Sequence, residues 1–362
     1  MTHILQGQVA ALFAFDIGYE VSLEKLSAMV ATTPIRPLSR KKQTPTYLQY
    51  TRPPQILHIG IVTGHFAVPG NIQATVFDFG AASISYRWPL AQNDPISLEQ
   101  LPQLSQDLYA LNLETHAREQ VEALIKRIEP AIIRPSLSQM SEDYYLYIIE
   151  KLDQPLKAEQ FFAQNRAVLA QSLRFETSPL SKTQQDDALN QMISYFDNDL
   201  TMVDWNAAII YDCDYEDTAN VLELLNVELL EARYIDDKLD QRIADFHNQT
   251  RKDKQFPIPL RNPYKLAIGE LAELRFESSL LYERVENALK LVGDLYLARL
   301  YRAAAQKFQL QEWDRVISRK LEIISDFYEM LTDRVHTMQS QTLEIVIVIM
   351  ILVELVMAFI GH

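Results

Sequence analysis

The chain is poor in cysteine, glycine and positive charge. Cys213 is its single cysteine, and nine glycines are spread through 362 residues. One thiol cannot form an internal disulfide, so we expect a reducing compartment, and no repeated phosphate-cradling glycine pattern supports nucleotide binding. The formal net charge is −14 at pH 7 and the pI is about 5.0. Because most of the surface would repel phosphate, we expect no DNA partner.

Sequence motifs of catalysis are also missing. The seven histidines show no HExxH or comparable ligand spacing. Cys213 lies between two acidic residues, which disfavour the thiolate, so we expect a buried structural thiol rather than a nucleophile. The sequence therefore predicts that the protein is not an enzyme and holds no cofactor.

A group of acidic residues is the best candidate for a metal site. They lie in the segments FDNDLTMVDW and YDCDYED: Asp197, Asp199, Asp204, Asp212, Asp214, Glu216 and Asp217. Hard cations take several carboxylates, but the ligand order and the glycine of an EF-hand loop are absent. Acids before a long helix also complement the positive end of its dipole. We therefore expect structural roles and no metal, and a metal-dependent enzyme stays the less favoured alternative.

The hydropathy pattern predicts an α+β protein, and 48% apolar content is enough to build its core. Residues 1–155 are expected to form a small domain of sheet and helices. Ser22 is the predicted N-cap of its first helix, Gly80 marks a bend or bulge within a strand, and Pro102 interrupts the second helix. Strands are predicted at 8–19, 55–63, 74–88 and 141–152, and helices at 22–30 and 97–129.

The segment from Thr33 to Pro54 combines several prolines with a basic cluster, Arg36, Arg40, Lys41 and Lys42. This composition indicates a loop. We expect the cluster to be solvated. Contact with RNA or with acidic lipid headgroups is the alternative, which the charges permit but do not demand.

Residues 156–342 are predicted to form a mainly helical domain with one short strand at 207–212. A long helix is expected at 220–248, with charged residues on the solvated face opposite its apolar stripe. A further helix is expected from Pro263 to about Val292. The apolar stripe of the long helix consists of Leu222, Leu225, Leu229 and Ile235.

The last predicted helix of this region carries an apolar seam. Its members recur every three or four residues: Trp313, Ile317, Leu321, Ile324, Tyr328, Leu331, Val335 and Met338. The average period is below 3.6, which predicts coiled-coil-like, left-handed packing. Packing within one chain and packing between copies are equally compatible with the seam.

An apolar run follows the seam without an intervening Gly or Pro. It extends from Leu343 to Ile360, with Glu344 and Glu354 as its ionisable residues. As a helix it is about 27 Å long, near the lower limit for crossing a bilayer. We expect a transmembrane helix at 343–360, in one rod with the seam. The alternative is an oligomerisation helix buried among its copies in a soluble assembly.

The two glutamates differ in expected depth. Glu344 lies at the start of the run, where we expect the membrane interface. Glu354 lies within it, where a carboxylate is costly, so we expect it to be protonated, paired, or facing a polar seam between copies. The alternative is that Glu354 reaches the far interface.

Several segments resemble the required for meiotic nuclear division family, also called domain of unknown function 155. They are VFDFGAASISYRW (76–88), ELLEARYIDDKLD (228–240), and the segments 289–331 and 343–355. The resemblance implies a small α+β domain, a helical region and one C-terminal membrane helix. It also implies organelle membrane proteins, one of which supports mitochondrial translation by holding ribosomes near the inner membrane.

The N-terminus has neither the basic presequence of the mitochondrial member nor an export signal. We therefore expect a bacterial inner membrane, with the bulk of the chain on the cytoplasmic side. The expected function is a non-enzymatic, homo-oligomeric scaffold that recruits a cytoplasmic protein partner to the membrane. A ribosome-associated partner and support of translation follow from the resemblance alone. The alternative is an oligomeric channel or transporter with Glu354 in its path.

Overall fold

The computed structural model describes residues 2–30, 33–34, 53–91 except 65 and 67, 94–252, 269, 272 and 295–360. The chain divides into two compact units. Unit 1 comprises Met1–Ala232 with Arg284–Gln311, and unit 2 comprises Arg233–Glu283 with Glu312–His362. The basic cluster, Arg36, Arg40, Lys41 and Lys42, lies outside the described residues. So does the helix expected from Pro263 to Val292, apart from Gly269 and Ala272, which are helical.

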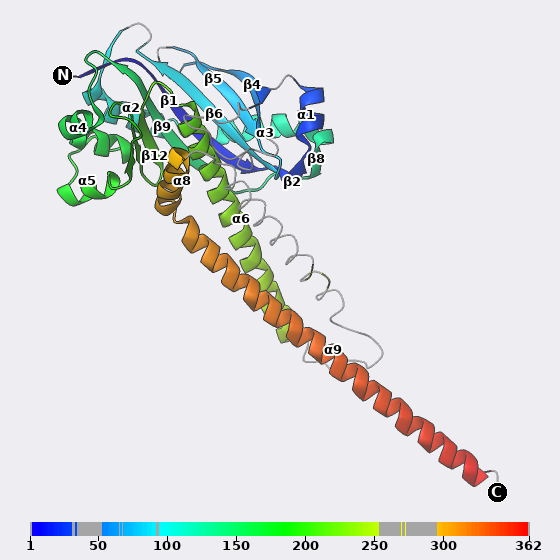
Figure 1. Cartoon of the computed structure of the whole chain (residues 1–362). Helices are drawn as coiled ribbons and strands as arrows, with labels where there is room; N and C mark the ends of the chain where they lie inside the picture. Colours follow the sequence, from blue (N-terminus) through cyan, green and yellow to red (C-terminus); the bar gives the residue numbers. More distant parts are fainter. Residues whose placement is uncertain are drawn as a thin grey trace. The chain divides into compact units, whose positions relative to one another are not determined.

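Unit 1 is built on a mixed sheet (Figure 1), and the predicted α+β class is confirmed. The strand order is β10-β11-β12-β9-β1-β6-β5-β4-β3, with β7 paired to β1. The pairing of β9 with β12 is parallel, whereas β1 pairs antiparallel with both β6 and β9. The strands are β1 (His3–Asp16), β3 (Thr33–Pro34), β4 (Gln55–Val62), β5 (Gly70–Val76), β6 (Ala81–Leu90), β7 (Ile96–Ser97), β9 (Glu142–Leu152), β10 (Met192–Ile193), β11 (Leu200–Val203) and β12 (Ala207–Tyr211). A separate pair is formed by β2 (Gly18–Val21) and β8 (Ile132–Pro135).

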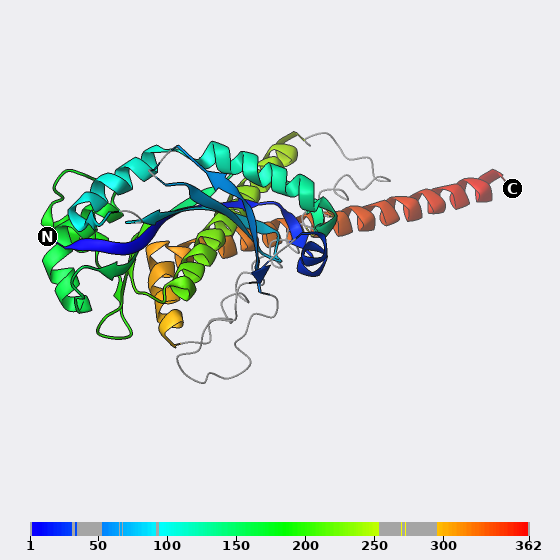
Figure 2. The same cartoon turned by 90° about the horizontal axis from the view of Figure 1, so that it is seen from above.

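Helices cover both faces of this sheet (Figures 1 and 2). One face carries α1 (Leu23–Met29), α2 (Leu101–Ala110), α3 (Glu114–Ile128), α4 (Ala158–Leu173) and α5 (Lys182–Ala188). The other face carries α8 (Leu295–Lys307) and the first half of α6 (Glu216–Lys252). Successive side chains of a strand point to opposite faces. Accordingly, Val9 and Ala11 of β1 belong to the core under α1 to α5, and Ala10 and Leu12 belong to the core under α6 and α8.

Most local predictions for unit 1 agree with the structure. Ser22 caps α1, its hydroxyl accepting from Lys25 N at 3.4 Å, and the expected strands at 141–152 and 207–212 are β9 and β12. The helical run expected at 97–129 is interrupted at residues 111–113, between α2 and α3, rather than near Pro102. Proline needs no hydrogen bond in a first helical turn, and Pro102 lies there in α2.

The expected single strand at 74–88 is a hairpin. β5 and β6 are joined by a turn in which Phe77 N donates to Ala81 O at 2.9 Å. Gly80 has φ +95°, and a Cβ at this position would lie 1.9 Å from the carbonyl oxygen of Gly18. Gly80 therefore allows a reversal of the chain instead of a bend within one strand.

The sheet-bearing unit extends past residue 155, the boundary expected from the sequence. β10, β11 and β12 continue the sheet beyond β9, and unit 1 reaches Ala232. Strands that pair at the edge of an existing sheet share its core. The described residues of 156–232, which were expected to belong to a separate helical domain, therefore fold together with the sheet of residues 1–155.

Unit 2 contains α9 (Leu310–Ile360), apart from its first residues, and the last part of α6. Lys320 on α9 pairs with Asp236 at 2.6 Å and with Asp240 at 2.7 Å, both on α6. The seam faces inward, since Ile317 and Ile324 are 1% exposed within the single chain. The other described members of the seam are half-buried: Trp313, Leu321, Tyr328, Val335 and Met338, while the side chain of Leu331 is outside the described part.

A buried ion-pair cluster joins distant parts of unit 1. The side chain of Asp204, between β11 and β12, has no exposed surface. It lies 2.6 Å from Nε of Arg174 at the end of α4 and 3.1 Å from Nζ of Lys307 in α8. Burial raises the pKa of Asp204, and the charges of Lys307 and Arg174 oppose this effect. Both cations also contact Asp187, which is half exposed: Arg174 pairs with its carboxylate, and Lys307 donates to its backbone carbonyl at 2.7 Å. Asp204 is the buried anion that the two cations share.

We expect Asp204→Ala to lower the free energy of unfolding by up to about 3–5 kcal/mol, because it removes the buried anion and leaves Arg174 and Lys307 with the half-exposed Asp187 alone. Urea unfolding of the full chain in detergent, followed by tryptophan fluorescence, measures the loss. Asp197→Ala is the matched control, since the Lys157–Asp197 pair is exposed and its loss should have little effect. Equal losses in both variants would contradict the assignment.

Candidate functional site

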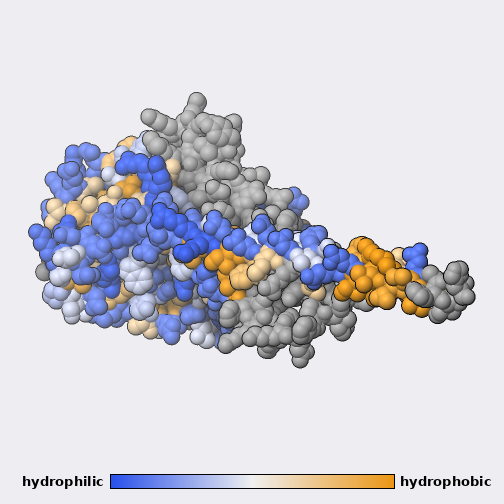
Figure 3. All heavy atoms as spheres, turned by 90° about the horizontal axis from the view of Figure 1, so that it is seen from below, coloured by the Kyte–Doolittle hydropathy of each residue, from blue (hydrophilic) through white to orange (hydrophobic). Residues whose placement is uncertain are grey.

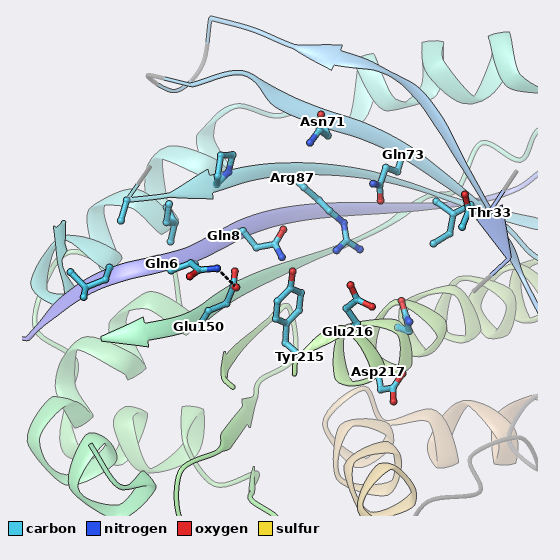
Figure 4. A pocket seen from close by; sticks show the side chains of 17 residues that line it. Gln6, Gln8, Thr33, Asn71, Gln73, Arg87, Glu150, Tyr215, Glu216 and Asp217 are labelled. Atoms are coloured by element: carbon cyan, nitrogen blue, oxygen red, sulfur yellow. Dashed lines mark hydrogen bonds between the residues drawn. The ribbon is translucent and has the colours of Figure 1, made fainter. Parts of the chain in front are cut away.

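A cavity of about 770 Å³ opens on the face of the sheet that α6 covers (Figure 4). It lies entirely within unit 1 and is formed by strands β1, β3, β4, β5, β6 and β9 and by the start of α6. Its described lining residues are Leu5, Gln6, Gly7, Gln8, Thr33, Ile56, Asn71, Gln73, Arg87, Pro89, Leu90, Ala91, Glu150, Tyr215, Glu216, Asp217 and Asn220.

The alternation of β6 explains why this cavity is polar. Ile84, Tyr86 and Trp88 belong to the core under α1 to α5. The residues between them, including Ser85 and Arg87, face the other way, toward α6. In the register of the sheet, Arg87 lies beside Asn71 of β5 and Ala10 of β1. Arg87 therefore occupies the middle of the sheet rather than an edge.

Arg87 is the one cation among the described lining residues. Figure 4 shows its side chain pointing from β6 into the space in front of Tyr215 and Glu216. Its Nε is buried and has no hydrogen-bond partner in the described part of the chain. Buried polar groups are normally hydrogen-bonded, so this guanidinium can donate to an anionic or carbonyl group.

Carboxylates and a tyrosine surround the arginine. Glu150 of β9 accepts from Gln6 Nε2 at 2.7 Å. Burial raises the pKa of Glu150, and the hydrogen bond from Gln6 partly opposes this. Burial also raises the pKa of Tyr215, as does the charge of Glu150, whereas Arg87 lowers it. The cavity thus combines both signs of charge in a partly desolvated space.

The polar layer continues beneath α6, beyond the cavity. Glu223 is 2% exposed and Glu231 is fully buried, whereas their helix was expected to carry solvated charges on this side. Burial raises the pKa of Glu223, opposed by the charge of Arg87. Two further polar groups are hydrogen-bonded: Tyr301 donates to Glu228 at 2.7 Å, and Asn226 donates to the carbonyl of Glu142 at 3.1 Å. The expectation of a solvated face is wrong because α6 is covered on more than its apolar stripe.

Glu231 should make the stability of the protein depend on pH. Burial, and next the charge of Asp16, raise its pKa well above the ordinary value, and neither carboxylate oxygen has a hydrogen-bond partner in the described residues. The folded state therefore favours the protonated form. This contribution to stability is complete below the unfolded pKa of about 4.3 and is lost as pH rises through the raised pKa.

Glu231→Gln keeps a neutral side chain at every pH, so its free energy of unfolding should fall less than that of the wild type between about pH 5 and pH 8. Each unit of pKa difference corresponds to about 1.4 kcal/mol. Urea unfolding at both pH values measures the change. Glu122→Gln, at an exposed position of α3, should behave like the wild type. Parallel pH profiles for all three proteins would refute the role of Glu231.

The acids considered as a metal site have separate local partners. Asp197 pairs with Lys157 at 3.1 Å, and Asp204 belongs to the buried ion-pair cluster. Asp199 accepts from the backbone N–H of Tyr195 at 2.9 Å. Asp212 accepts from the N–H of Asp214 at 3.0 Å. Among the described residues, no group of three or more His, Cys, Asp or Glu side chains is arranged to hold a metal ion.

Two of the remaining acids, Glu216 and Asp217, line the cavity in the first turn of α6. Cys213 precedes them in the connection from β12 and is exposed, so the expectation of a buried thiol is wrong. The sequence places this residue directly after a buried strand, but the chain has already left the sheet there.

The C-terminal part of α9 is apolar on all sides. From Leu343 to Met357 every side chain is exposed, including Glu344 and Glu354. Figure 3 shows this segment as a continuous apolar surface. No part of its most apolar stretch is buried. Among the described residues, α9 is the one helix whose length and composition suit a membrane span.

These features define an α+β protein with a polar cavity on its sheet and one candidate membrane helix. Residues 6–218 match the family described as uncharacterized protein MJ0711, N-terminal domain, and the chain belongs to this family. The matched residues include the whole described lining of the cavity except Leu5 and Asn220.

The chain is also similar to the uncharacterized protein MJ0711 of Methanocaldococcus jannaschii. The two are 29% identical over 220 residues, which cover 60% of this chain and 66% of the relative. The chain therefore matches just under two thirds of the relative's length. No solved structure matches the chain.

The family match overturns the resemblance to the required for meiotic nuclear division family. Much of that resemblance rested on segments 289–331 and 343–355, whose described residues form α8, the start of α9 and its apolar end. Such patterns arise in many unrelated proteins with a helix near a membrane. The match over residues 6–218 lies instead in the sheet unit. The relative is archaeal, so the expected bacterial source has no support.

Proposed function

We propose that the protein is a single-pass, membrane-anchored, non-enzymatic scaffold whose α+β unit recruits a protein partner at the membrane surface. The observation that carries this proposal is the exposed apolar end of α9. Support of translation and a ribosome-associated partner rested on the rejected resemblance and form no part of the proposal.

The energetics of α9 favour a nonpolar environment. Large apolar side chains from Leu343 to Met357 are 47% to 71% exposed. Removing one such side chain from water contributes roughly 1.5–3 kcal/mol, so the whole segment gains tens of kcal/mol in lipid. An interfacial helix needs one polar face, whereas this segment is apolar all round apart from its glutamates. A membrane span accounts for this pattern better.

The single cysteine favours a cytoplasmic location for unit 1. Cys213 is exposed and has no second cysteine with which to pair. Exposed free thiols persist in reducing compartments. This argument supports the cytoplasmic side of whichever membrane holds α9.

Replacing Val348 and Ile351 with lysine should release the protein from membranes. A lysine near the centre of a spanning helix costs about 2.5–3.5 kcal/mol for insertion, and two act together. Carbonate washing of membrane vesicles, followed by immunoblotting of pellet and supernatant, measures the release. The wild type should stay in the pellet.

Replacing Val316 and Ile323 with lysine is the matched control. Both are exposed positions of the same helix outside the apolar segment, so this double variant should stay in the pellet. Release of the wild-type chain by carbonate would overturn the anchor. Equal behaviour of the two double variants would do the same, because the apolar segment would then have no special role.

Glu354 provides a test of association between anchors. A carboxyl group within a bilayer is costly and is stabilised by hydrogen bonds to another helix. We expect Glu354→Leu to reduce the crosslinked oligomers recovered from native membranes. Glu344→Leu, at the start of the segment, should leave them unchanged. An identical crosslinking pattern for Glu354→Leu and the wild type would contradict the proposed association of anchors through Glu354.

A further inference from the structure

The cavity around Arg87 has the size of a small-molecule site. Its volume of about 770 Å³ falls within the usual range for ligand pockets, about 300–1,000 Å³. Its described lining comes from side chains on the sheet and on the start of α6, so its walls belong to one compact unit. The proposed scaffold function assigns it no role.

The charges of the cavity restrict the class of ligand. The described lining holds one cation, Arg87, and three carboxylates, Glu150, Glu216 and Asp217. A purely anionic molecule such as phosphate would be repelled by the carboxylates. A purely cationic molecule would leave the buried Nε of Arg87 without a partner. A molecule with one negative and one positive group can pair with both Arg87 and the carboxylates.

The spacing of the charged walls suits a small molecule of this kind. Arg87 is on β6 and Glu150 is on β9, with β1 between them. Two strand spacings are about 10 Å, and Glu150 lies four residues beyond Leu146, the β9 residue aligned with Arg87 through Ala10, so the two backbones are about 16 Å apart. Both side chains are long and line the cavity, which shortens this gap to the length of an extended small molecule. The guanidinium fork matches the geometry of a carboxylate, and a carboxylate side chain pairs with an ammonium group.

Amide side chains supply the remaining contacts. Each carries a donor and an acceptor, so together they suit a polar ligand body. These side chains are Gln6, Gln8, Asn71, Gln73 and Asn220. Tyr215 is the sole aromatic residue among the described lining residues, so a base cannot be stacked between two rings there.

We propose that this cavity binds a small zwitterion that carries a carboxylate and an ammonium group. Arg87 holds the carboxylate, Glu150 with Glu216 holds the ammonium group, and the amides contact the rest of the molecule. The site is independent of the membrane anchor, because all of its described residues belong to unit 1.

Isothermal titration of the full-length protein in detergent tests this assignment. The probes are L-lysine, L-glutamine and 4-aminobutanoate at up to about 10 mM, since mM affinities are measurable at such concentrations. For L-glutamine and 4-aminobutanoate the N-acetyl derivative lacks the ammonium charge, for L-lysine the Nα,Nε-diacetyl derivative does, and in each case the primary amide lacks the carboxylate. Inorganic phosphate and glucose serve as anionic and neutral probes. We expect at least one zwitterion to bind and both of its derivatives to lose at least about tenfold in affinity.

Arg87→Gln should weaken the binding of that zwitterion at least about tenfold while leaving the already weak primary amide unchanged. Arg127→Gln, at an exposed position of α3 on the opposite face of the sheet, is the matched control and should bind like the wild type. If Arg87→Gln does not fold, Glu150→Gln replaces it. That variant should weaken the zwitterion and leave the N-acetyl derivative unaffected.

Three results would overturn the proposal. The first is that none of the three zwitterions binds. The second is that phosphate or glucose binds more tightly than every zwitterion. The third is that binding is the same in Arg87→Gln, or in Glu150→Gln when that replaces it, as in the wild type. None of these results bears on carbonate extraction, so the membrane proposal stands or falls separately.

Discussion

The structure of unit 1 depends on the covering of its sheet from both sides. β1 lies between β6 and β9, with α1 to α5 on one face and α6 and α8 on the other. The first face is an ordinary apolar core. The second is divided between neighbouring strands, with an apolar part around Ala10 and Leu12 of β1 and a polar part around Arg87 of β6. Because α6 closes over both, its acids are held in a partly water-free space where charges interact strongly.

The polar part forms one layer with two environments. At the start of α6 it opens into the cavity, where Glu216 and Arg87 meet solvent. Further along, Glu223 and Glu231 are buried, so protons are retained to higher pH than in water. The distance from Glu216 to Glu231 along the helix is about 22 Å, comparable to the length of the strands below. One helix therefore supplies both the rim of the cavity and the buried acids beyond it.

Much of the fold was predictable from local patterns, and the cavity was not. Apolar runs located β1, β9 and β12, and an uninterrupted pattern correctly predicted α9 as one helix from the seam into the apolar segment. The cavity unites β1, β5, β6 and β9, and their order in the sheet follows from pairing between distant segments. The available signal was the alternation SISYRW in β6, which carries polar residues on one face of a strand that turned out to be central. Helical periodicity likewise predicted the apolar stripe of α6. It did not predict that a second side of this helix is also covered, which buries Glu223 and Glu231.

The two-residue repeat of β6 constrains how the gene of this protein can change. Ser83, Ser85 and Arg87 alternate with Ile84, Tyr86 and Trp88, and each set faces a different environment. Loss of one codon early in this strand would exchange the two sets, placing a guanidinium among aromatic rings and an indole in the cavity. Insertions and deletions here should therefore be tolerated far less than substitutions, whichever ligand the cavity holds.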